Sequence, residues 1–263
     1  MQTPDISYLS LGVCALMLSI PALIIILFKI PIGKQLIIAI IRMIIQLLLI
    51  GIFLKYIFSV NNVFLTVGWF LIMILFASLS VINSSNLKLS GFFIPVFISF
   101  FIANGSVILF VNTFVIQLND ILAPQFLIVL GGMLLGNSLK GSIIGIRRFY
   151  SSIYRNENRY FFHLANGASA FELLGSYFKE SIIEALKPTM ATMATMGIVF
   201  LPGMMTGQII GGITPIIAIK YQIVIMLAIF TATALSVSLS ILFSVQSSFT
   251  EYGVLRKELF IQK

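Results

Sequence analysis

Few residues of this sequence have side chains suited to catalysis or metal binding, and they are scattered along the chain. The 263 residues include 8 acidic side chains and 1 histidine. No Gly-rich phosphate loop, His-Glu-x-x-His motif or paired nucleophile occurs, so we expect no enzyme, no catalytic residue and no metal or cofactor site in this chain. A lone Cys14 can form neither an internal disulfide nor a thiolate cluster. His163, beside Phe161 and Phe162, is interpreted as an interfacial residue.

Arg42 and Gln46 are an unusual polar pair in an otherwise apolar stretch. Their spacing of four residues places both on one helix face. A guanidinium inside a membrane costs about 2.5–3.5 kcal/mol on insertion scales, and such groups normally face a bundle interior or a water-filled path. This face is therefore a candidate substrate pathway or conformational latch. The alternative is that Arg42 extends back to the lipid headgroups.

The run Leu201-Pro202-Gly203 lies inside another apolar stretch. Proline removes a backbone donor and glycine loosens the chain, so we expect a kinked or broken helix here. Broken helices often mark a substrate path, although a purely structural kink remains the alternative. Met204 and Met205 follow directly and are assigned to the same candidate pathway. Thioethers can bind soft metals, but core packing is the favoured interpretation of these methionines.

Two glycine motifs share the pattern Gly-Met-x-x-Gly-amide. Such glycines allow helix backbones to approach closely, and the amide can donate a hydrogen bond across the contact. We therefore predict that the fifth and sixth spans cross at these motifs and form a pivot, with chance packing glycines as the alternative. The residues assigned to this contact are Gly132, Gly136, Asn137, Gly203, Gly207 and Gln208.

The elements that must position these residues are transmembrane helices. The chain is 59% hydrophobic and 9% charged, whereas soluble domains carry about 25% charged residues. Its apolar stretches reach the roughly 20 residues that a helix needs to cross a bilayer. We predict an all-α, polytopic transmembrane bundle with a single domain over residues 1–263. Its seven spans are expected at 6–28, 35–58, 63–82, 91–116, 121–139, 189–212 and 216–243.

Basic residues predict the orientation of the bundle, because Lys and Arg are retained on the cytoplasmic side. Placing the hydrophilic segment 140–188 inside leaves only Arg42, Lys55 and Lys220 away from that side. The N-terminus is then outside and the C-terminus, with Lys263, is cytoplasmic, in an inner or plasma membrane. The same rule explains the net charge of +8, so nucleic-acid binding is not expected.

Segment 140–188 is predicted to contain an amphipathic helix over 168–187, entered through a turn at Gly167 and followed by the next span at Pro188. Such a helix lies along a membrane face or docks into a partner. Its apolar face carries Phe171, Leu174, Phe178, Ile182 and Ala185, and its polar face carries Ser176, Glu180, Glu184 and Lys187.

The run Asn166-Gly167-Ala168-Ser169, followed by Ile182-Ile183-Glu184-Ala185-Leu186-Lys187-Pro188, resembles the coupling segment of ABC-transporter permeases. Other segments resemble the FetB-type (YbbM-like) iron-export permeases and the membrane halves of plant aluminium-tolerance half-transporters. These segments cover most of residues 40–240 and include Arg42–Leu47, Gly51–Val60, Gly132–Asn137, Leu201–Gly207 and Ala218–Gln222.

The resemblance implies a permease subunit that exports a metal ion, iron, as one of a pair of copies in contact with membrane lipids. A separate cytoplasmic ATPase would bind ATP and Mg. Iron rests on the resemblance alone. Two alternatives remain: a stand-alone secondary carrier, and a non-transporting scaffold that recruits a soluble protein. The residues expected to couple to the ATPase are Gly167, Ala168, Ser169, Phe171, Glu172 and Glu184.

Overall fold

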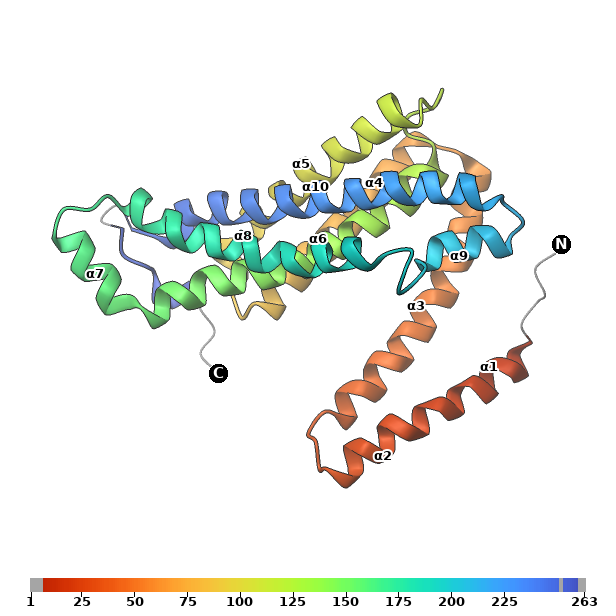
Figure 1. Ribbon diagram of the computed structural model, residues 1–263, viewed down its shortest axis with the longest axis horizontal. Coiled ribbons are helices and arrows are strands. Elements are labelled where there is room, and N and C mark those ends of the chain that lie inside the picture. The colour runs from red at the N-terminus through yellow and green to blue at the C-terminus, as the bar shows by residue number, and fades with distance from the viewer. Residues whose placement is uncertain (1–6, 251–252, 260–263) are drawn as a thin grey trace.

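The computed structural model describes residues 7–250 and 253–259 and is built from helices joined by short turns (Figure 1). Within these residues it contains no β-sheet. Residue 6, where the first predicted span begins, and Lys263 of the predicted cytoplasmic tail lie outside the described residues. The prediction of an all-α transmembrane bundle is confirmed.

Five long helices form the bundle. They are α4 (Val63–Ser84), α5 (Leu89–Phe110), α6 (Pro124–Arg155), α8 (Ala170–Thr195) and α10 (Pro215–Ser248). The central helix α10 packs against α5, α6 and α8, and α6 also packs against α4 and α8. Proline begins both α6 and α10, where its missing N–H costs nothing and its fixed φ suits a helix.

The N-terminal helices project away from this bundle as an arm (Figure 1). The arm consists of α1 (Tyr8–Ala15), the 3₁₀ turn η1 (Leu16–Leu18), α2 (Ser19–Leu27) and α3 (Gly33–Val60). The most apolar windows of its two candidate spans contain no buried residue, whereas those of the four spans in the bundle are 39–50% buried. Ile57, near the end of α3, is fully buried and anchors the arm to the bundle.

Four short elements complete the chain. A π-helical turn, η2 (Val111–Val115), extends α5, and α7 (Glu157–Ala165) joins α6 to α8. The short helix α9 (Gly203–Ile210) packs against α10, and η3 (Lys257–Leu259) lies near the C-terminus. Both α7 and α9 therefore follow one of the long helices that make the bundle.

Six of the seven predicted spans coincide with helices long and apolar enough to cross a membrane. The stretch 189–212 differs. Helix α8 continues through Pro188 to Thr195, so Pro188 does not begin a new helix; one missing backbone donor is tolerated within a long, packed helix. The chain then leaves the helical conformation until Gly203. The break predicted around Pro202 is thus present, and it divides the stretch into two short helical pieces.

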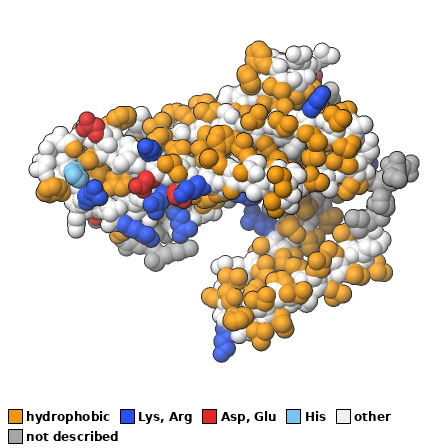
Figure 2. All heavy atoms as spheres, viewed as in Figure 1, with side chains coloured by type: hydrophobic (Ala, Val, Ile, Leu, Met, Phe, Trp, Pro, Cys, Tyr) orange, Lys and Arg blue, Asp and Glu red, His pale blue; other side chains and the backbone are white. Residues whose placement is uncertain are grey.

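Segment 140–188 was predicted to be a hydrophilic loop. It is instead a helical extension of the bundle. Helix α6 has 32 residues and is therefore about 48 Å long, which exceeds the roughly 30 Å of a hydrocarbon core. Its apolar and glycine-rich face continues to pack on α8 and α10 beyond the predicted end of the span. Charged side chains gather over this end of the molecule (Figure 2).

Candidate functional site

A groove about 780 Å³ in volume runs between α3, α4 and α6. Arg42 and Gln46 both line it, so the structure confirms that they share one face of α3. The rest of its lining is apolar or aromatic, apart from the indole N–H of Trp69, and includes Phe53 and Gly136. The main polar feature of the arm is therefore a guanidinium and an amide beside an apolar groove. Both lie on a helix that the bundle leaves uncovered.

The other predicted pathway residues lie elsewhere. Pro202 is the N-cap of α9, and its carbonyl accepts a hydrogen bond of 3.0 Å from the Thr206 hydroxyl. Met205 is buried and Met204 packs against the core, in keeping with a packing role for both methionines. Their helix lies against α10, whereas Arg42 lies on α3. The structure therefore does not bring the two halves of the predicted pathway together within one chain.

The two glycine motifs also have different neighbours. A Cβ placed at Gly132 would lie 3.3 Å from Met73 of α4, and one at Gly136, Gly203 or Gly207 would meet no atom within 4 Å. The Asn137 amide donates to the Met133 carbonyl of its own helix at 2.8 Å. The motifs do not cross in this chain, because the break after Thr195 leaves α9 packed on α10.

Close helix packing occurs one turn further along α6, at Gly141 and Gly145. A Cβ at Gly145 would lie 2.5 Å from Val237 Cγ1 of α10 and 3.2 Å from Ala185 Cβ of α8. A Cβ at Gly141 would collide with Thr233 of α10. These glycines therefore allow three helices to meet. The Gly-x-x-x-Gly spacing of residues 141–145 could have revealed them, but the expectation of a hydrophilic loop there concealed it.

A second feature missed by sequence reasoning is a fully buried polar cluster centred on Asn104 of α5. Its amide donates to Ser236 Oγ of α10 at 3.2 Å, and its carbonyl oxygen accepts from Ser138 Oγ of α6 at 3.2 Å. One side chain thus joins three helices. A lone Asn among Phe and Ile residues was the available signal, since buried polar groups in a membrane protein need partners.

Five of the six predicted coupling residues cluster where α7 ends and α8 begins. Gly167 has φ +89°, a conformation that favours glycine, and forms the turn. Ser169 then caps α8: its hydroxyl accepts from the Glu172 N–H at 3.3 Å, and the Glu172 carboxylate accepts from the Ser169 N–H at 3.2 Å. Phe171, beside this capping box, was predicted on the packed, apolar face of the helix. Its side chain is instead 83% exposed. We call residues 166–172 the tip.

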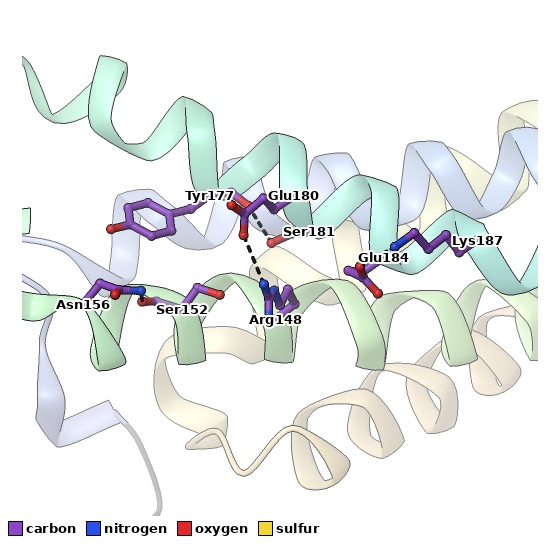
Figure 3. A network of polar contacts seen from close by, with 8 residues as sticks. All are labelled: Arg148, Ser152, Asn156, Tyr177, Glu180, Ser181, Glu184 and Lys187. Atoms are coloured by element: carbon purple, nitrogen blue, oxygen red, sulfur yellow. Dashed lines mark hydrogen bonds and ion pairs between the residues drawn. The ribbon is translucent and has the colours of Figure 1, made fainter.

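Glu184 does not belong to this tip. It lies further along α8, where its carboxylate accepts a hydrogen bond of 2.7 Å from Lys187, and that bond lowers the pKa of Glu184 (Figure 3). One turn earlier, Glu180 forms an ion pair of 3.2 Å with Arg148 of α6. Exposed pairs of this kind contribute about 0.2–1 kcal/mol. The Arg148–Glu180 pair therefore joins α8 to α6 but adds little stability, whereas the Glu184–Lys187 pair lies within α8.

Helix α8 packs through Leu174, Ser181 and Ala185, which are buried. It lies along α6 and α10 rather than flat on a membrane face, which corrects that part of the prediction. Among the described residues, no group of three His, Cys, Asp or Glu side chains is placed to hold a metal ion. The side chains of α8 and its neighbours thus provide packing, polar contacts and an exposed tip.

The fold defines an integral membrane protein made of long apolar helices with one charged, helical end. The chain belongs to the uncharacterised protein family UPF0014, whose family model matches residues 8–249. The tip, the groove and the buried polar cluster all fall within the matched residues.

Curated relatives come from bacteria and plants. The chain is 33% identical to the UPF0014 membrane protein slr1647 of Synechocystis over 74% of this chain and 75% of the relative. It is 32% identical to the "Probable iron export permease protein FetB" of Escherichia coli over 79% of each chain. It is 31% identical to the protein ALUMINUM SENSITIVE 3 of Arabidopsis thaliana over 52% of this chain and 50% of the relative. No solved structure matches this chain.

Proposed function

We propose that this protein is the permease subunit of an ABC transporter that exports iron, with ATP and Mg bound by a separate cytoplasmic ATPase. The observation that carries the proposal is the similarity to FetB, named as a probable iron export permease, over 79% of both chains. The exposed tip beyond the apolar part of the bundle supports it, because a permease without ATP-binding motifs needs a surface for its ATPase.

The tip is suited to transmit a push from an ATPase. Ser169 and Glu172 fix the start of α8 reciprocally, and Phe171 is available for burial in a partner. Helix α8 has 26 residues and is therefore about 39 Å long. It packs on α6 and α10 along the way. Movement of the tip would therefore shift α8 against the two longest helices of the bundle.

The arm supports the pairing of two copies. Leaving Arg42 against lipid would cost about 2.5–3.5 kcal/mol on insertion scales, and the groove beside it is open. We assign this face to contact with a second permease copy, which would cover Arg42 and Gln46. Because a guanidinium repels a metal cation, Arg42 serves as a latch between the copies and does not bind the iron itself.

Reconstitution with an ABC ATPase tests the proposal. We expect the permease to co-purify with its ATPase, to stimulate ATP hydrolysis and, in proteoliposomes with the ATPase on the outer face, to move Fe²⁺ from the medium into the lumen when ATP is added. Gradient-driven transport without an ATPase would indicate a secondary carrier instead. A partner that binds without ATP hydrolysis would indicate a scaffold. Either result would overturn the proposal.

A substitution at the tip tests the coupling surface separately. Phe171→Ala should lower ATPase stimulation at least about tenfold, which corresponds to about 1.4 kcal/mol of lost contact. The matched control is Phe114→Ala, which removes a 67% exposed ring on η2, outside the tip. Equal stimulation by both variants would show that the tip is not the docking surface.

A further inference from the structure

A polar cavity of about 610 Å³ lies at the charged end of the molecule, where α6, α7 and α8 meet. It is separate from the groove beside Arg42, and apart from Glu172 of the tip its lining has no role in the proposed function. Its lining includes the arginines, the histidine and the carboxylates of Arg148, Arg155, Arg159, His163, Glu172 and Glu180. The volume is in the range of small-molecule sites, which span about 300–1,000 Å³.

The charges around the cavity do not cancel. Both carboxylates already have partners, because Glu180 pairs with Arg148 at 3.2 Å and Glu172 accepts from the Ser169 N–H in the capping box. Arg155 and Arg159 form no ion pair within the described part of the chain. Two guanidinium groups, from the end of α6 and the start of α7, are therefore left without a counter-charge at one cavity.

Three of the uncharged side-chain donors in the lining are occupied. The Tyr160 hydroxyl donates to the Gly253 carbonyl at 2.8 Å, and burial, with a smaller effect from Tyr177, raises the pKa of Tyr160, so this group stays neutral. The Asn156 amide donates to Ser152, and the Ser176 hydroxyl donates to Leu173. The charged donors that remain for a ligand are the two guanidinium groups, and the His163 ring and the hydroxyls of Ser151 and Tyr177 lie in the same lining.

We infer that this cavity binds a phosphate group, carried either by a small soluble molecule or by a lipid headgroup. Two guanidinium forks match the geometry of phosphate oxygens and bind them through paired, charge-assisted hydrogen bonds. A ligand held there would bridge α6, α7 and α8 directly behind the tip. It would therefore stabilise the α6–α7–α8 hairpin, whether or not the protein works with an ATPase.

The length of α6 brings both sources of phosphate into reach. Counted from Pro124, a hydrocarbon core takes about 20 residues, so the remaining part of this 32-residue helix projects up to about 18 Å. The headgroup layer is only about 5–8 Å thick on each side. The near wall of the cavity, at Arg148, is then at headgroup level, and Arg155 and Arg159 face water.

Thermal unfolding of the full chain in nanodiscs tests the inference. The probes are inorganic phosphate, added to phosphatidylcholine nanodiscs at constant ionic strength with chloride as reference, and phosphatidylglycerol nanodiscs without added phosphate. Stabilisation by phosphate in phosphatidylcholine indicates a soluble ligand. A higher unfolding temperature in phosphatidylglycerol than in phosphatidylcholine, with no effect of added phosphate, indicates a headgroup. Absence of both effects would overturn the inference.

Charge variants assign the effect to the cavity. The double variant Arg155→Gln and Arg159→Gln should weaken the apparent affinity for the active probe at least about tenfold. The matched control, Arg147→Gln, removes an exposed charge from α6 outside the cavity and should retain wild-type affinity. The double variant Arg155→Lys and Arg159→Lys checks folding and should keep part of the binding. Equal losses in Arg147→Gln would refute a phosphate site. The site would also be refuted if the wild-type chain showed no effect of phosphate and the Gln double variant lost binding of the ATPase instead.

Discussion

Asn104 shows how one polar side chain can determine the register of a membrane bundle. Its amide contacts Ser236 of α10 and Ser138 of α6 in surroundings from which water is excluded. Interhelical hydrogen bonds in membranes average about 0.6 kcal/mol, with a maximum of about 1.7. Leaving a buried donor unpaired costs more, about 1–3 kcal/mol. The cluster therefore penalises misalignment more than it stabilises the correct arrangement.

We predict that Asn104→Ala lowers the free energy of unfolding by about 1–3 kcal/mol, because it orphans the Ser138 hydroxyl and opens a cavity. The measurement is a denaturation curve of the detergent-solubilised protein. Asn137→Ala is the control: that amide bonds only to its own helix, at Met133, and the change should stay within about 0.5 kcal/mol of wild type. Equal losses in the two variants would argue against a three-helix role for Asn104.

At the scale of elements, glycines on α6 decide how closely three helices pack. Replacing a helical glycine by alanine gains about 0.5–1 kcal/mol of helix propensity. At Gly145 that gain is opposed by a Cβ only 2.5 Å from Val237 Cγ1 and 3.2 Å from Ala185 Cβ. Overpacking of a tight core costs about 1–3 kcal/mol. The steric cost is therefore expected to exceed the propensity gain.

Gly145→Ala should accordingly destabilise the protein by about 1–2 kcal/mol, the net of overpacking and helix propensity. Gly136→Ala, on the same helix but with no atom within 4 Å of the new Cβ, should be neutral or stabilising. Thermal unfolding in one detergent compares the pair directly. If Gly145→Ala proved as stable as Gly136→Ala, the close packing of α6 against α8 and α10 would be disproved.

Sequence patterns predicted the elements better than their contacts. Six spans, the break before Gly203 and the turn at Gly167 follow from local properties of the sequence. These are the length of apolar stretches, a proline and a glycine that can adopt positive φ. The partners of Gly136 and Gly207 could not be predicted in this way. A Gly-x-x-x-Gly motif indicates that another helix can approach closely, but it does not indicate which helix. Segment 140–188 was misjudged for a related reason: its charges lie on the outer face of helices whose inner face still packs.

For the whole molecule, the uncovered arm is the feature that one chain does not explain. Its helices are long and apolar, yet they carry Arg42 and Gln46 beside an open groove and bury almost nothing. Lipid can cover leucine and isoleucine, but it is a poor partner for a guanidinium. A second copy that supplies polar or backbone acceptors to Arg42 would remove this cost. The proposed pairing thus follows from one charge on an otherwise apolar surface.

The single cysteine allows this pairing to be measured without adding a label site, because Cys14 is exposed on α1. Spin-labelled protein in nanodiscs that hold two chains should give a defined distance between the two Cys14 labels by pulsed electron paramagnetic resonance. Dilution with unlabelled Cys14→Ser protein should reduce the signal without moving the distance.

Arg42→Leu should abolish that defined distance while the chain still inserts, since the substitution removes an insertion cost of about 2.5–3.5 kcal/mol. Lys55→Leu, which removes an exposed charge from the same helix outside the groove, is the control and should preserve the distance. A broad distance distribution in wild type would show that the arm is covered by lipid alone. A defined distance that is unchanged in Arg42→Leu would show that Arg42 is not a latch between copies.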